Sequence, residues 1–154
     1  MENSFLDLIP RPERVVRHSP TGTRSRIRPG ILVVDDEAAV RSFLKAALEL
    51  QGFTVWLAEK GVEAVDLYAR QRSAIDLVLL DVRMPGLDGP HTLAALRRLD
   101  PDVRCCFMSG HTGEYTEAEL LLRGAACVFA KPFRLSELGA LLCRQIVAVE
   151  CLGA

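Results

Sequence analysis

The sequence predicts a doubly wound α/β fold, in which helices cover both faces of a parallel β-sheet. Short apolar runs alternate five times with longer segments whose apolar residues have helical spacing, and short loops separate them. The run Leu77–Leu80 is apolar at every position, which is typical of a strand buried on both faces. The chain of 154 residues, 49% hydrophobic and 25% charged, has the size and composition of one globular domain.

The first half of this domain contains two strands and two helices. Residues 31–34 are rich in β-branched side chains, which favour strands. The next segment places Val40, Phe43 and Leu44 at helical spacing, and Gly52 follows as a candidate C-terminal cap. The predicted elements are the strands Ile31–Val34 and Phe53–Ala58 and the helices Ala38–Gln51 and Gly61–Arg72.

The second half continues the alternation. A turn-rich stretch, Met84–Gly89, leads into a helix that ends before Asp100-Pro101, because proline disfavours a helical conformation in the residue before it. Gly124 closes the helix that follows the fourth strand. The predicted strands run from Ile75 or Asp76 to Leu80, Val103–Met108 and Cys127–Ala130, and the helices end at about Leu99, span Glu114–Arg123, and run from Leu135 to about Val149.

The N-terminal segment differs from this core in composition. Residues 1–29 contain four of the eight prolines, and residues 1–30 carry six arginines against three acidic residues, while the rest of the chain is net acidic. We expect residues 1–29 to be a disordered basic arm, because so few apolar side chains cannot offset the entropy lost on ordering. The domain is then expected to span residues 30–149, and residues 150–154 form a tail too short for an output domain.

Composition also limits the compartment and the chemistry. No apolar run approaches the roughly 18 residues of a membrane span, and Pro10, Arg11 and Pro12 interrupt the N-terminal apolar stretch as no signal peptide would. We therefore expect a cytoplasmic protein. The five cysteines include no C-x-x-C pair, so we predict neither a disulfide framework nor a zinc site and interpret them as small core or helix-surface side chains.

Polar side chains stand where four of the predicted strands end. Asp35 and Asp36 follow the first strand, Asp81 the third, Ser109 the fourth and Lys131 the fifth. Ligands of open parallel sheets bind at this edge, so we expect these groups to converge. Three carboxylates repel one another unless a cation shares the site, and oxygen ligands suit Mg²⁺ rather than zinc or copper. Such a set can accept a phosphoryl group on a carboxylate.

Each of these residues also has a simpler interpretation. Asp35 and Asp36 could cap the following helix, Asp81 could form a turn, and Lys131 could be a solvated surface residue. The evidence for a site is therefore the whole set at four strand ends, and no single member of it.

Four separated motifs resemble the receiver domain of two-component response regulators. They are Ile31–Glu37 (ILVVDDE), Leu79–Gly89 (LLDVRMPGLDG), Met108–Gly110 (MSG) and Lys131–Phe133 (KPF), and the resemblance runs from about Ile31 to Val149. It implies a flavodoxin-like, five-stranded parallel sheet in the order 2-1-3-4-5, with the site at the point where the strand order reverses.

The resemblance also implies roles for the acidic residues. Asp81 corresponds to the phosphoacceptor, which takes its phosphoryl group from a histidine kinase or a histidine phosphotransfer protein. Mg²⁺ is the expected cofactor, with Asp36 and Asp81 as ligands, Asp35 acting mainly through a water molecule, and the backbone carbonyl of Arg83 completing the protein's share of the shell.

The remaining motif residues correspond to groups around the phosphoryl. Ser109 matches the switch hydroxyl, and Lys131 matches the lysine that pairs with the phosphoryl group or the acceptor carboxylate. The Lys131-Pro132 peptide bond is expected to be cis. Arg83 and His111 occupy the two positions that flank the phosphoryl group and tune its hydrolysis.

One position departs from the family pattern. Three residues before the lysine the family usually has Tyr or Phe, which rotates with the switch hydroxyl, but this chain has Val128. Phe129 follows and should point to the opposite face of the sheet. Valine has little rotamer freedom, so either the loop after Ser109 carries the signal alone, or the partner surface is read differently.

The interpretation favoured by these residues is a receiver that is phosphorylated on Asp81 and acts on no external substrate. Its downstream partner is expected on the surface formed by Glu114–Arg123, Cys127–Ala130 and Leu135–Val149. Two alternatives are a docking module that is not phosphorylated and an aspartate-nucleophile phosphatase, whose usual D-x-D motif is absent after the first strand. Nucleic-acid binding by the arm is disfavoured, because only Phe5 could stack on bases.

Overall fold

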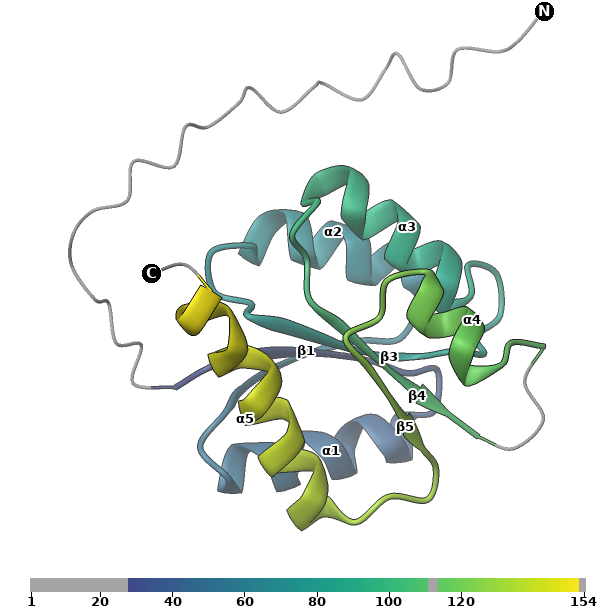
Figure 1. Ribbon diagram of the computed structural model, residues 1–154. Coiled ribbons are helices and arrows are strands. Elements are labelled where there is room, and N and C mark those ends of the chain that lie inside the picture. The colour runs from purple at the N-terminus through teal and green to yellow at the C-terminus, as the bar shows by residue number, and fades with distance from the viewer. Residues whose placement is uncertain (1–27, 111–113, 153–154) are drawn as a thin grey trace, which may run out of the picture.

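The computed structural model describes residues 28–110 and 114–152, and its centre is a parallel sheet of five strands. The strand order is β2-β1-β3-β4-β5, so the chain reverses its direction of winding between β1 and β3 (Figure 1). This order confirms the doubly wound prediction. The strands are β1 (Gly30–Val34), β2 (Thr54–Ala58), β3 (Leu77–Asp81), β4 (Cys105–Ser109) and β5 (Cys127–Ala130).

Helices cover both faces of this sheet (Figure 1). The helices α1 (Ala38–Leu50) and α5 (Leu135–Leu152) pack on one face, and α2 (Gly61–Gln71), α3 (Gly89–Leu99) and α4 (Glu117–Leu122) pack on the other. No helix among the described residues is both long and apolar enough to cross a membrane.

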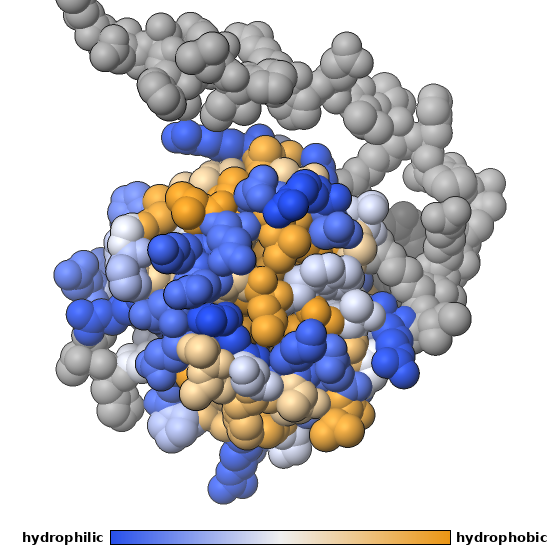
Figure 2. All heavy atoms as spheres, turned by 180° about the vertical axis from the view of Figure 1, so that it is seen from behind, coloured by the Kyte–Doolittle hydropathy of each residue, from blue (hydrophilic) through white to orange (hydrophobic). Residues whose placement is uncertain are grey.

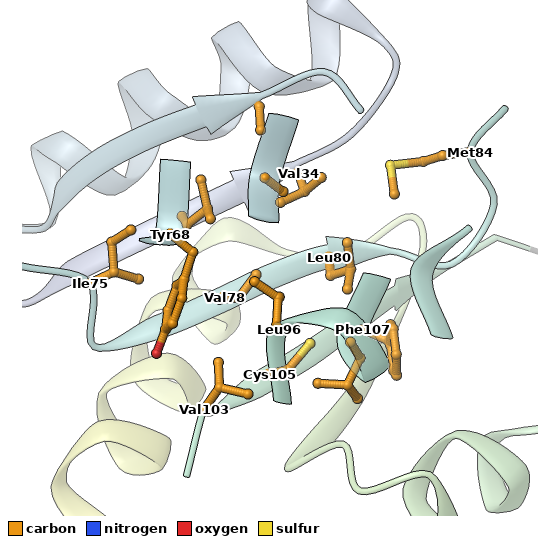
Figure 3. Close-up of a cluster of buried hydrophobic side chains, with 14 of the residues drawn as sticks. Val34, Tyr68, Ile75, Val78, Leu80, Met84, Leu96, Val103, Cys105 and Phe107 are labelled. Carbon is orange, nitrogen blue, oxygen red and sulfur yellow. The ribbon is translucent and has the colours of Figure 1, made fainter. Parts of the chain in front are cut away.

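The sheet separates two apolar cores, because successive residues of a strand point to opposite faces. Val34, Val78 and Leu80 face α2 and α3, where Tyr68 and Leu96 pack against them (Figure 3). The alternate residues of the same strands face α1 and α5; they are Ile31, Val33, Leu77 and Leu79. All residues of β1 and β3 are buried, which explains their uninterrupted apolar pattern.

Several boundaries differ from the prediction, most clearly at α4. The helix begins at Glu117 because Thr116 caps it: the Thr116 hydroxyl accepts from Glu119 N at 3.2 Å, and the Glu119 carboxylate accepts from Thr116 N at 2.6 Å. Strand β4 begins at Cys105, since Val103 N is bonded in a turn to Asp100 O. Helix α5 continues to Leu152, past the expected end near Val149.

The described surface also carries large apolar side chains. Figure 2 shows that such side chains lie among charged ones on the face opposite to the view of Figure 1. The exposed members all belong to helices: Phe43, Leu50, Val62, Leu121, Leu122, Leu141 and Val147. Four of these lie on α4 and α5, the two helices of the expected partner surface.

Candidate functional site

The carboxyl ends of four strands meet at one edge of the sheet. Asp35 directly follows β1, Asp81 and Ser109 are the last residues of β3 and β4, and Lys131 directly follows β5. Backbone hydrogen bonds extend the ladder there, from Asp35 N to Ala58 O at 3.2 Å and from Lys131 N to Ser109 O at 2.7 Å. The strand ends therefore hold the functional side chains on an ordered backbone.

The Lys131 ammonium lies between two of the carboxylates. Its Nζ is 3.0 Å from Asp35 Oδ2 and 3.4 Å from Asp81 Oδ1. Asp35 is fully buried and Asp81 is 7% exposed, so water screens these charges poorly. Burial alone would lower the pKa of Lys131, but hydrogen bonds and charge from Asp35 and Asp81 raise it above its ordinary value.

The buried position of Asp81 makes its negative charge costly. Burial, opposed by the Lys131 charge and reinforced by the charges of Asp35 and Asp36, raises the pKa of Asp81 from 3.8 to about 6. One ammonium thus does not neutralise three neighbouring carboxylates. At neutral pH the site holds excess negative charge that a further cation could offset.

The acidic cluster has the donor chemistry that Mg²⁺ requires. Asp35, Asp36 and Asp81 each offer a carboxylate oxygen, and these oxygens lie within 4.8 Å of one another. Oxygen donors without histidine or cysteine suit this hard cation. Both oxygens of Asp35 already accept hydrogen bonds, from Lys131 Nζ at 3.0 Å and from Glu37 N at 2.9 Å. Asp36 and Asp81 are therefore the better candidates for direct ligands.

The other predicted residues surround this cluster. Ser109 is half-buried at the end of β4, and its hydroxyl donates to Gly110 O at 3.1 Å. The side chain of Arg83 is exposed. The Lys131-Pro132 bond is cis, as the resemblance implied. His111 lies outside the described residues.

Val128 and Phe129 occupy opposite faces of β5, as the strand alternation predicts. Val128 packs against the core beneath α2, α3 and α4, whereas Phe129 belongs to the other core. Phe129 makes an edge-on contact with Phe133, with ring centroids 6.5 Å apart. The position where the family has a rotating aromatic side chain therefore carries only a small aliphatic one.

The sequence did not predict a polar contact between the residue that caps α3 and the segment before α4. The Tyr115 hydroxyl donates to Asp88 Oδ2 at 2.9 Å, and Asp88 caps α3 by accepting from His91 N, also at 2.9 Å. The Arg123 guanidinium lies over the Tyr115 ring, 5.0 Å from its centroid. Asp88 before Gly-Pro was a visible capping signal, but its pairing with Tyr115 joins residues distant in sequence, which no local pattern indicates.

Asp88 and Tyr115 also line a pocket, together with residues that directly follow Asp81 in the chain. Its walls come from the segment after β3 and from the segment before α4, and the lining residues are Val82, Arg83, Met84, Pro85, Gly86, Asp88, Glu114 and Tyr115. The segment directly after Asp81 is thus connected both to α3 and to the start of α4.

Gly89 lies against the backbone of Asp81 and Val82, where only a residue without a side chain fits. Its N–H donates to Val82 O at 2.9 Å, and a Cβ placed there would lie 2.5 Å from Asp81 O and 2.8 Å from Val82 Cα. We expect Gly89→Ala to lower the free energy of unfolding by about 1–3 kcal/mol, because the backbone itself must move. Urea unfolding would measure this. Gly110→Ala is the matched control, since its added methyl meets no atom of the described residues within 4 Å; equal losses in both variants would contradict the prediction.

Comparisons with known proteins agree with this fold. A family model described as the response regulator receiver domain matches residues 31–142. The crystal structure of a response regulator receiver domain protein from Clostridium thermocellum has a TM-score of 0.76 at 26% identity, and the match covers 80% of this chain and 98% of that one. A CheX–CheY–BeF₃–Mg²⁺ complex from Borrelia burgdorferi has a TM-score of 0.69 at 27% identity, over 80% of this chain and 90% of that one.

Curated relatives are similar over the same region. The response regulator MprA of Mycobacterium sp. (strain KMS) is 42% identical over 70% of this chain and 46% of its own length. Sporulation initiation phosphotransferase F of Bacillus subtilis is 33% identical over 70% of this chain and 86% of its own length. The sensor kinase CckA of Brucella abortus is 37% identical over 70% of this chain, but over only 11% of its own length. This chain thus spans less than half of MprA and a small part of CckA.

Proposed function

This chain belongs to the response regulator receiver family of two-component signalling, and we propose that Asp81 accepts a phosphoryl group from a phosphohistidine. The observation that carries the proposal is the position of Lys131 Nζ, which lies within 3.4 Å of both Asp35 and Asp81 beside a third carboxylate. This arrangement combines a nucleophile, a fixed cation and excess negative charge.

In the proposed reaction an Asp81 oxygen attacks phosphorus, the P–N bond to the donor imidazole breaks, and an acyl phosphate forms. The pKa of about 6 leaves Asp81 mainly ionised at neutral pH, so the nucleophile is available. Mg²⁺ held by Asp36, Asp81 and the Arg83 carbonyl would neutralise charge on the phosphoryl oxygens. Asp35 keeps the Lys131 ammonium at the acceptor, where it can pair with the phosphoryl group.

The proposed partners follow from the same chemistry. The donor would be a histidine kinase or a histidine phosphotransfer protein, a proposal supported by relatives named a sensor kinase and a phosphotransferase. The downstream partner would bind the surface of α4, β5 and α5, where Leu122 is 87% and Val147 52% exposed. The cytoplasmic location expected from the sequence belongs to the same proposal.

The switch must use a route other than an aromatic residue at Val128. We assign Ser109 as the hydroxyl that donates to the phosphoryl group, and His111 and Arg83 as residues that tune its hydrolysis. The hydrogen bond from Tyr115 to Asp88 supports a second route for the signal, beside the one through Ser109, because it joins the segment after Asp81 to the start of α4.

Mass spectrometry after incubation with acetyl phosphate and Mg²⁺ tests phosphorylation directly. We expect the chain to gain the mass of one phosphoryl group, and we expect Asp81→Asn or chelation of Mg²⁺ to abolish the gain. The adduct should be labile in base, as an acyl phosphate is. A folded chain that stays unmodified with both acetyl phosphate and phosphorylated donor proteins would instead support the docking module.

A further inference from the structure

Two cysteines face each other on neighbouring strands of the sheet. Cys106 of β4 pairs in register with Cys127 of β5, and their Sγ atoms lie 2.8 Å apart. Neighbouring strands are separated by about 4.8 Å, which lies inside the range of about 4.4–6.8 Å between the Cα atoms of disulfide-bonded cysteines. A disulfide between them therefore needs small side-chain rotations and no separation of the strands.

The two thiols lie in different surroundings. Cys106 is fully buried, whereas Cys127 is only half-buried and is therefore the more accessible of the two to solvent. Both belong to the core beneath α1 and α5. Cys105, the preceding residue, is also buried but belongs to the opposite core, where Figure 3 shows it.

The pKa values of the two thiols are shifted in opposite directions. A hydrogen bond with the Cys106 thiol stabilises the Cys127 thiolate and lowers the pKa of Cys127, although burial opposes this. The same hydrogen bond, together with burial, raises the pKa of Cys106. Cys127 is therefore the nucleophilic sulfur, and Cys106 keeps its proton next to it.

We propose that Cys106 and Cys127 form a redox-active dithiol that a peroxide oxidises to an intramolecular disulfide. The Cys127 sulfur attacks one peroxide oxygen, the O–O bond breaks, and hydrogen peroxide leaves a sulfenic acid on Cys127 and one water molecule. The Cys106 sulfur then attacks the Cys127 sulfur, the S–O bond breaks, and the departing hydroxide takes the Cys106 proton as a second water. Two thiols are oxidised and one peroxide is reduced.

This site lies outside the acidic cluster but on the strands that serve it. Cys106 belongs to the strand that ends in Ser109, and Cys127 to the strand that Lys131 follows. A disulfide would link these two strands covalently. Disulfides of cytosolic proteins are usually transient, and the proposed location of this chain is cytoplasmic, so we expect a reductant to reverse this one.

Peptide mapping of the peroxide-treated chain tests the proposal. The full chain carrying Cys143→Ser and Cys151→Ser, which removes the cysteines of the last helix, is treated with hydrogen peroxide, unfolded, alkylated and digested without reductant. We expect the intact mass, measured before alkylation, to fall by two hydrogens. After digestion, we expect a cross-linked peptide pair containing Cys106 and Cys127. Dithiothreitol should reverse both changes, and Cys105 should be recovered alkylated.

Two variants and two outcomes complete the test. Cys105→Ser should retain the cross-link, and Cys127→Ser should lose it. Recovery of both Cys106 and Cys127 as alkylated thiols after peroxide would overturn the proposal, as would sulfinic acid on Cys127 beside an intact Cys106 thiol. If a variant fails to fold, the map of the chain that retains both cysteines decides alone. None of these measurements depends on phosphorylation of Asp81, so the two proposals succeed or fail separately.

Discussion

Replacing Asp81 with asparagine is expected to raise the free energy of unfolding of the magnesium-free chain by up to about 3 kcal/mol near pH 8. The reason is the pKa of Asp81, which burial and the neighbouring carboxylates raise from 3.8 to about 6. A carboxyl group whose pKa is raised in the folded chain favours the unfolded chain once it ionises. Asparagine has nearly the same shape and can still accept from Lys131, but it carries no charge.

The sign of the pH dependence follows from the two pKa values. Below about pH 4 Asp81 is protonated in both the folded and the unfolded chain, so its charge has no effect. Between about pH 4 and pH 6 the unfolded chain releases the proton more readily, and the native chain loses relative stability as the pH rises. Above about pH 6 the loss is complete. The advantage of Asp81→Asn should therefore grow over this window and then level off.

Urea unfolding at several pH values, in the presence of a chelator, would measure this difference. Asp66→Asn is the matched control, because Asp66 is an exposed carboxylate that pairs with Arg70 on the surface of α2, and its replacement should change stability little. Added Mg²⁺ should reverse the order of the two chains, since a ligand that binds the native carboxylate cluster stabilises it by mass action. An asparagine variant that is less stable than the parent near pH 8 without Mg²⁺ would contradict the prediction.

The charged groups at this edge of the sheet lower the local stability of the fold. Asp35 is fully buried and Asp81 nearly so, and a third carboxylate stands beside them, although hydrophobic side chains would pack there more favourably. This unfavourable burial of charge lies at the ends of the strands. The two apolar cores beneath them, which include every residue of β1 except Gly30 and every residue of β3 except Asp81, hold the rest of the sheet together.

Much of the arrangement could be predicted because it depends on local patterns. Apolar runs located the strands, and the rule that parallel strands present their carboxyl ends at one edge predicted that Asp35, Asp81 and Lys131 lie together. The opposite orientations of Val128 and Phe129 follow from the two-residue period of a strand. The T-x-x-E capping box at Thr116 was also visible, and its omission placed the start of α4 three residues too early.

The features that could not be predicted depend on register between distant segments. The contact between Tyr115 and Asp88 requires the loops after β3 and β4 to approach each other, and no local signal specifies that approach. The pairing of Cys106 with Cys127 likewise depends on which residues of β4 and β5 are aligned; a shift of one residue would direct the two thiols to opposite faces. Composition alone identified these cysteines only as small apolar side chains.

Replacing Lys131 with methionine should have the opposite effect to replacing Asp81. Methionine retains an aliphatic chain of similar length but removes the ammonium, so Asp35 loses the cation 3.0 Å from its buried carboxylate. Breaking a buried ion pair by removing one partner typically costs about 3–5 kcal/mol, and we expect a loss of this size in the magnesium-free chain near neutral pH. Urea unfolding of the parent and the variant, with a chelator present, would measure it.

A double-mutant cycle with Asp35→Asn separates the ion pair from simple packing. If the loss comes from the unpaired charge, Asp35→Asn should restore much of the stability in the Lys131→Met background, whereas Lys131→Arg should lose far less than Lys131→Met. A loss of less than about 1 kcal/mol in Lys131→Met would mean that the pair behaves like one on the surface.

Mg²⁺ then distinguishes the two roles that Lys131 has in the proposed mechanism. Bound at the carboxylates, the divalent cation should restore much of the stability of Lys131→Met, because it supplies the missing positive charge to the folded site. It should not restore signalling by the phosphorylated chain, since the proposed contact from the ammonium to the phosphoryl group has no substitute in methionine. If Mg²⁺ restores stability but not signalling, the Lys131 ammonium has a role in signalling beyond balancing charge. If Mg²⁺ restores both, the role of Lys131 is limited to charge balance.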